Sequence, residues 1–114
     1  MIDILSRNEG DITVVEIAGK LNTGASPEAE GFVNDLIDEG ATKILFNFEE
    51  LDFISSTGLR VILATGKKLT AIGGKLVLCS PNHTVSDVFR MSGFNQMFNV
   101  FETEVEALKS FKFF

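Results

Sequence analysis

Residues 51–63, LDFISSTGLRVIL, decide how the rest of this chain can fold. The preceding residues 43–48, KILFNF, form a nearly continuous apolar run, which is typical of a covered strand in a parallel sheet. From Leu59 onward, apolar residues recur at helical spacing. Three hydroxyl residues and a glycine, residues 55–58, separate the two patterns. Because Ser and Thr side chains accept hydrogen bonds from the first turn of a helix, we expect a helix to begin within two residues of Thr57.

Outward from this stretch, the chain alternates between strand and helix patterns. Period-2 alternation predicts a hairpin at residues 1–18, which turns at Glu9 and Gly10. Ser26 and Pro27 are the expected N-cap and first residue of a helix that stops at Gly40. Downstream, we expect a strand at 75–80, a short helix from about 84 to 93, a strand at 97–101 and a helix at 103–111.

This order predicts a single α/β domain over residues 1–114. An N-terminal antiparallel hairpin followed by β-α units indicates a mixed, mostly parallel sheet of four or five strands with about four helices. We expect the side chains of Phe46, Phe48, Ile54, Leu59, Ile62 and Leu63 to be mostly buried, and Lys67 to lie on the outer face.

Composition narrows the class of function. The chain has 114 residues, 45% of them hydrophobic, and a net charge of −6. An acidic surface argues against binding nucleic acid, because phosphates need a basic partner. No apolar run approaches the roughly 20 residues needed to span a bilayer, and no secretory signal is visible, so we expect a soluble cytoplasmic protein. We therefore expect the chain to bind another protein.

Candidate catalytic residues are few. With one cysteine, Cys79, and one histidine, His83, no zinc-ligand spacing exists, so we expect no metal site and no cofactor. Cys79 lies in an apolar run and is expected to be a buried, reduced core residue. A hydrolase would have to use Ser56 with His83, but no Gly-x-Ser-x-Gly elbow is present. A binding protein is therefore preferred to an enzyme.

Four segments in order carry a family resemblance. Residues 46–59, FNFEELDFISSTGL, resemble the signature of STAS domains, in particular the bacterial anti-sigma factor antagonists. Residues 19–22, GKLN, are similar to the family's G-x-[LI]-D segment, and residues 73–79, GGKLVLC, to its G-G-x-[LM]-x-[LIV]-x element. Residues 88–94, VFRMSGF, are similar to its helix end before the last strand.

The resemblance implies a regulator that works by binding. In this family an anti-sigma factor that is also a serine kinase phosphorylates the antagonist and supplies ATP and Mg²⁺, and a phosphatase resets the system. The unphosphorylated form binds the anti-sigma factor and releases the sigma factor. By position, the phosphate acceptor is Ser56, with Thr57 as the adjacent alternative. The implied partner-binding residues are Asn22, Asn47, Ser55, Ser56, Thr57, Gly58 and Arg60.

Two positions depart from the family pattern. Ser55 stands where the motif has Asp, and Asn22 where the G-x-L-D segment has Asp. Both changes remove a negative charge beside the acceptor. Two explanations stay open: a different kinase phosphorylates this protein, or its phosphorylation has been lost. The alternative function is a non-switched STAS interaction subunit of a transporter, ABC or signalling complex.

Overall fold

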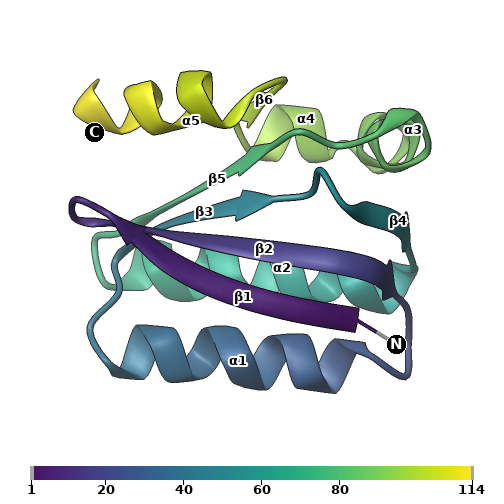
Figure 1. The fold of residues 1–114 in the computed structure, drawn as a ribbon, viewed down its shortest axis with the longest axis horizontal. Coiled ribbons are helices and arrows are strands. Elements are labelled where there is room, and N and C mark those ends of the chain that lie inside the picture. Colours follow the sequence, from purple (N-terminus) through teal and green to yellow (C-terminus); the bar gives the residue numbers. More distant parts are fainter. Residues whose placement is uncertain (1, 114) are drawn as a thin grey trace.

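The computed structural model describes residues 2–113, which form one six-stranded sheet with helices on both faces (Figure 1). The strands are β1 (Ile2–Glu9), β2 (Ile12–Leu21), β3 (Lys43–Asn47), β4 (Leu51–Ile54), β5 (Lys75–Cys79) and β6 (Val100–Phe101). The helices are α1 (Ser26–Asp38), α2 (Ser56–Ala71), α3 (His83–Ser92), α4 (Phe94–Met97) and α5 (Glu104–Ser110), followed by the 3-10 helix η1 (Phe111–Phe113). Met1, expected to begin the first strand, and Phe114, the end of the expected domain, lie outside the described residues.

The sheet confirms the predicted hairpin and mostly parallel arrangement. β1 and β2 pair antiparallel from Ile2 opposite Gly19 to Glu9 opposite Ile12. The remaining pairs are parallel, in the order β1-β2-β3-β5-β6, and β4 pairs with β2 off this path. The strand count exceeds the predicted four or five, because β4 was interpreted only as the connection leading into the helix. The last strand is also shorter than expected, since Met97 belongs to α4 and β6 begins at Val100.

β2 is shared between two parallel neighbours. Its residues Thr13–Glu16 pair with β3, and its residues Gly19–Leu21 pair with β4, with a register shift between Gly19 and Lys20. The chain therefore leaves β3, turns, and rejoins β2 further along before α2 begins (Figure 1). This detour carries the start of α2 to the carboxyl end of the sheet.

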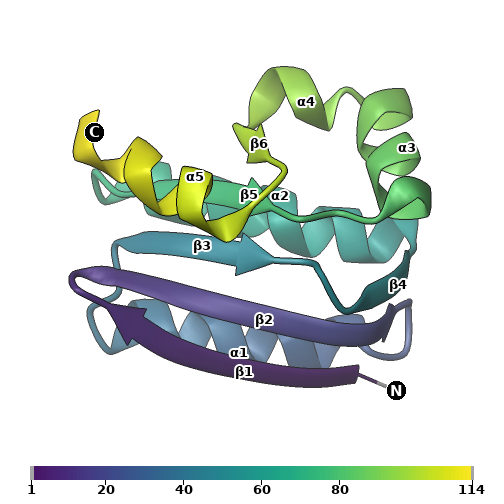
Figure 2. The same ribbon diagram turned by 45° about the horizontal axis from the view of Figure 1, so that its top comes forward.

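Alternate residues of the inner strands pack on opposite faces, as the continuous apolar run of β3 predicted. On β3, Ile44 and Phe46 belong to the core between the sheet and helices α1 and α2, whereas Leu45 belongs to a second core between the sheet and α5. Figure 2 shows α5 lying along β3 and β5. Both faces of β3 are thus covered, which accounts for its lack of polar alternation.

A series of aromatic contacts links the sheet to the helices at its end. The rings of Phe46 and Phe48 meet edge to face with centroids 5.9 Å apart, and Phe48 meets Phe89 of α3 at 5.5 Å. Phe89 stacks on Phe94 at 5.7 Å, and Phe94 contacts Phe98 at 5.4 Å. Aromatic pairs of this kind add about 0.5–1.5 kcal/mol beyond their buried area. The series fixes α3 and α4 against the core.

The buried face of α2 differs in part from the prediction. Phe46, Phe48, Ile54 and Ile62 are buried as expected, but Leu59 and Leu63 are only half-buried. The core side of α2 is formed by Gly58, Val61, Ile62, Thr65, Gly66 and Leu69. Lys67 is exposed, as predicted. Leu63 is therefore a flank residue of the helix rather than a core residue.

Candidate functional site

The hydroxyl-rich turn lies at the start of α2, as predicted. β4 ends at Ile54 and α2 begins at Ser56, within two residues of Thr57. Ser55 is the N-cap, because its Oγ accepts a hydrogen bond from the Gly58 backbone N–H at 3.2 Å. The Ser55 backbone N–H donates to the Leu21 carbonyl at 3.0 Å. Ser55 thus fills the capping role open to the Asp of the family motif, without the negative charge.

The three hydroxyls of the turn are not equivalent. Thr57 Oγ1 lies 2.8 Å from Ser55 Oγ and 3.0 Å from Thr23 Oγ1, so hydrogen bonds hold it on two sides. Ser56 is exposed, and its hydroxyl makes no hydrogen bond within residues 2–113. Of the three hydroxyls, that of Ser56 is the one that is exposed and forms no hydrogen bond to another described residue.

The loop that precedes α1 packs beside this turn. Asn22 is half-buried, and its Oδ1 accepts from the Ala25 backbone N–H at 3.0 Å. The predicted N-cap of α1 was wrong by one residue, because the N-cap is Ala25 and Ser26 is buried, donating its hydroxyl to the Asn22 carbonyl at 2.8 Å. Asn22 therefore shapes the loop that presents Thr23 to Thr57. Thr23 was not included among the site residues predicted from the sequence, although its hydroxyl, next to Asn22 in the loop, could have suggested it.

Gly58 permits a close approach between α2 and β2. A Cβ at this position would lie 2.7 Å from the Leu21 carbonyl oxygen and 2.8 Å from Cγ1 of Ile54. Real Cβ atoms do not approach other atoms so closely, and the nearer of the two is a backbone atom that cannot swing aside. Gly58 is buried, so its part in the site is to seat the helix start against the sheet.

Asn47 lies apart from the turn in its contacts. It is 7% exposed, and its Nδ2 donates to Oε1 of Glu104 on α5 at 2.9 Å. Its Oδ1 accepts from the Glu49 backbone N–H at 2.8 Å, and Glu104 also forms an ion pair with Arg7. Asn47 thus joins the end of β3 to α5, a structural role that the sequence did not predict.

Arg60 extends the site along the helix. It is exposed, lies one turn beyond Ser56, and forms no ion pair among the described residues. Residues four apart on a helix are neighbours on its surface, so the Arg60 guanidinium can reach a charge placed on Ser56.

The one histidine of the sequence, His83, is not placed to act as a base for Ser56. The side chain of His83 is 92% exposed and its Nε2 lies 3.4 Å from Oδ2 of Asp87, with no hydrogen bond to Ser56 in the part of the chain described. Cys79 is a free, fully buried cysteine, and burial raises the pKa of its thiol to about 11. A thiol held neutral in this way is a weak nucleophile. Neither residue supports catalysis at Ser56.

The fold and the capped hydroxyl turn define an α/β protein that presents an exposed serine, Ser56, at a helix start. The family model for the STAS domain matches residues 3–107, so the chain belongs to the STAS domain family. Within residues 2–113, no helix has both the length and the apolar character required to cross a membrane.

Individual relatives of the chain are anti-sigma factor antagonists. It is 34% identical to BtrV of Bordetella bronchiseptica, assigned as an anti-sigma factor antagonist, over 84% of this chain and 83% of BtrV. It is 30% identical to the anti-sigma F factor antagonist of Lysinibacillus sphaericus, over 73% of this chain and 72% of the relative. Anti-sigma factor antagonists are non-enzymatic regulators, in agreement with the prediction that the chain is not an enzyme.

A solved structure gives the same picture of the fold. The anti-sigma factor antagonist SpoIIAA of Bacillus, in its unphosphorylated form, is 28% identical and superimposes with a TM-score of 0.84 over 98% of both chains. Its phosphorylated form superimposes with a TM-score of 0.75 over 95% of this chain and 98% of SpoIIAA. Nearly all of the chain thus superimposes on a protein whose structure is known in both the unphosphorylated and the phosphorylated form.

Proposed function

We propose that this chain is an anti-sigma factor antagonist controlled by phosphorylation of Ser56. In its unphosphorylated form it binds an anti-sigma factor that is also a serine kinase, and so releases a sigma factor. The kinase brings ATP and Mg²⁺, a phosphatase removes the phosphate, and the proposed location is the cytoplasm. The observation that carries the proposal is that the Ser56 hydroxyl is exposed and forms no hydrogen bond to another described residue, whereas the hydroxyls of Ser55 and Thr57 on either side of it are hydrogen-bonded.

The start of α2 suits a phosphate. The first backbone N–H groups of a helix lack intrahelical acceptors and carry a partly positive charge, which favours an anion there. Arg60, one turn along and without an ion pair among the described residues, adds a full positive charge on the same side. A phosphate on Ser56 is therefore accommodated without unfolding the helix.

The same phosphate acts against binding to a partner. It adds roughly −1.5 to −2 charges to a turn that contains no charged residue from 55 to 59. Burying that charge in an interface costs desolvation and repels acidic groups of the partner. A loss of about 1.4–2.8 kcal/mol in binding free energy corresponds to a ten- to hundredfold loss in affinity.

Phosphate transfer tests the choice of acceptor. The protein is incubated with Mg²⁺-ATP and the anti-sigma factor kinase of its own source cell, and the product is mapped by mass spectrometry. We expect one phosphate, on Ser56 in the wild type and absent from Ser56→Ala. Phosphate on Thr57 or Ser55 would refute the assignment to Ser56, because both of those hydroxyls are held by other groups.

Binding tests the switch itself. By titration calorimetry, Ser56→Ala should bind the anti-sigma factor like the wild type, and Ser56→Glu should bind ten- to hundredfold more weakly. Ser6→Glu, on an exposed residue of β1, is the control for added charge and should bind normally. If Ser56→Glu binds as tightly as Ser56→Ala, the non-switched STAS interaction subunit is the better description.

A further inference from the structure

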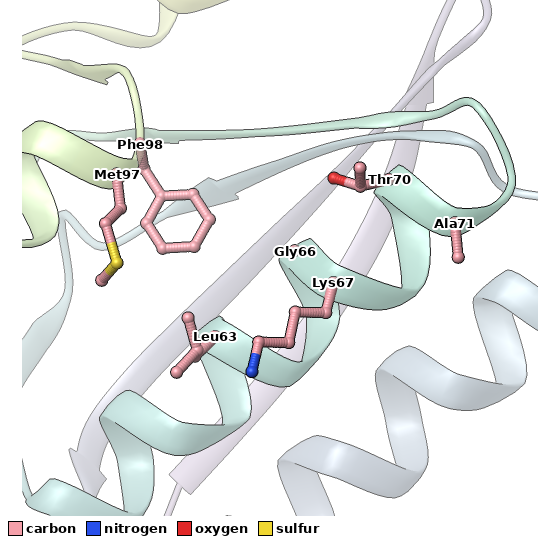
Figure 3. Close-up of a pocket in the computed structure, with 7 residues that line it drawn as sticks. All are labelled: Leu63, Gly66, Lys67, Thr70, Ala71, Met97 and Phe98. Carbon is pink, nitrogen blue, oxygen red and sulfur yellow. The ribbon is translucent and has the colours of Figure 1, made fainter.

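An open apolar groove lies along the second half of α2, beyond the Ser56 turn (Figure 3). Its volume is about 410 Å³. We call it the α2–α4 groove and define it by Leu63, Gly66, Lys67 and Thr70 on α2 with Met97 and Phe98 at the end of α4. A second cavity of about 300 Å³ shares Gly66, Thr70, Met97 and Phe98 and continues the groove to the start of β5 at Lys75.

Of the two residues at the end of α4 that line the groove, Phe98 is held firmly and Met97 can adapt. A Cβ on Gly66 would lie 2.6 Å from Cε1 of Phe98, so the glycine allows that ring to rest directly on the helix. Phe98 is the last member of the aromatic series that begins in β3. Met97, in contrast, is 52% exposed, and its flexible thioether side chain suits binding to varied apolar surfaces.

The charge of the groove is opposite to that of the protein. The chain carries sixteen acidic and ten basic residues, yet among the described residues the charged ones that line the two cavities are Lys67 and Lys75, both basic. Lys67 is exposed and makes no ion pair within residues 2–113. An apolar strip edged by lysine is complementary to an apolar surface edged by carboxylates.

The groove continues the face of α2 that carries Ser56. Ser56, Arg60, Leu63, Lys67 and Thr70 follow one another at spacings of four, three, four and three residues, which places them on one face of a helix. With a rise of about 1.5 Å per residue, Leu63 lies roughly 10 Å along the axis from Ser56. A partner that contacts the start of α2 reaches the groove by extending along this face.

We propose that the α2–α4 groove binds an amphipathic helix of a partner protein, with apolar side chains in the groove and Asp or Glu residues beside Lys67. Sites for small ligands usually enclose 70–90% of the ligand, whereas this groove is open to solvent along its length. A groove between two helices with apolar walls instead matches the way proteins bind amphipathic helices. The proposal does not depend on phosphorylation of Ser56.

Two synthetic helical peptides test the charge preference. They share the same leucines at i, i+3, i+4 and i+7, and differ only in carrying either Glu or Lys at the flanking positions. Titrated into the ¹⁵N-labelled protein, the Glu peptide should shift the amides of residues 63–71 and 97–98 and bind at least tenfold more tightly than the Lys peptide. Equal binding of the two peptides, or shifts confined to other surfaces, would overturn the proposal.

Matched variants test the residues. Lys67→Glu should weaken binding of the Glu peptide about tenfold, and Met97→Asp should abolish it. Lys109→Glu on α5 and Met91→Asp on α3, where Met91 is 82% exposed, make the same changes elsewhere and should leave binding unchanged. If the control variants lose as much affinity as the groove variants, the binding depends on overall charge and the assigned site is wrong.

Discussion

Replacing Gly58 by alanine should destabilise the protein even though alanine favours helices. Gly58 lies in the first turn of α2, where a Cβ would come within 2.7 Å of the Leu21 carbonyl oxygen. Gly31 in α1 is the matched control, because it is exposed and a Cβ there would meet nothing within 4 Å. The two substitutions are chemically identical and differ only in the space around them.

The expected changes in unfolding free energy have opposite signs. Alanine is favoured over glycine inside a helix by about 1 kcal/mol, so Gly31→Ala should be stabilised by about that amount. At Gly58 the same gain is opposed by overpacking, which costs about 1–3 kcal/mol. The upper end applies because the obstructing atom belongs to the backbone, which leaves a net loss of about 2 kcal/mol.

Urea denaturation of the wild type and both variants measures the difference, which should be about 3 kcal/mol between the two variants. The proposed phosphorylation of Ser56 should also be slower in Gly58→Ala, since the displaced helix start carries this serine. If Gly58→Ala is stabilised as much as Gly31→Ala, the close seating of α2 against β2 is incorrect.

Three further predictions follow from burial and charge. Ile62→Ala, in the core face of α2, should cost about 2–5 kcal/mol, whereas Lys67→Ala should cost less than ~0.5 kcal/mol, and similar midpoints in denaturant would contradict this orientation of the helix. Glu104→Ala leaves the buried Asn47 amide without its acceptor and should lower the free energy of unfolding by about 1–3 kcal/mol in the same denaturation experiment. An unchanged midpoint would show that this hydrogen bond does not stabilise the fold. Burial raises the pKa of Cys79 from 9.0 to about 11, so the neutral thiol contributes stability at neutral pH that is lost as pH rises from about 9 through about 11. At pH 8 the thiol should react with Ellman's reagent only after unfolding, and rapid labelling of the native protein would show that it is not buried.

The elements predicted best from sequence were those whose evidence is local. The apolar run of β3, the turn at Glu9 and Gly10, and the hydroxyls before α2 each follow from neighbouring residues, and the structure confirms them. β4 was missed because it has four residues, two of them exposed, and is a strand only through its pairing with β2.

In the candidate site, too, features set by neighbouring residues were predicted and contacts between distant residues were not. The capped turn was predicted because capping depends on residues within one helical turn. The partner of Asn47 could not be predicted, since Glu104 lies 57 positions away and meets it only after α5 folds back over the sheet. The hydrogen bond between Thr23 and Thr57 spans 34 positions and was missed for the same reason.

The sharing of β2 between β3 and β4 has a consequence for motion. Among the described residues β4 has a single strand neighbour, and a register shift interrupts that pairing. Its amide protons should therefore exchange with solvent sooner than those of β3, which lies between two strands. The segment that leads into Ser56 should therefore open locally while the central strands stay closed, and this opening would let the proposed phosphate acceptor enter a kinase active site without global unfolding.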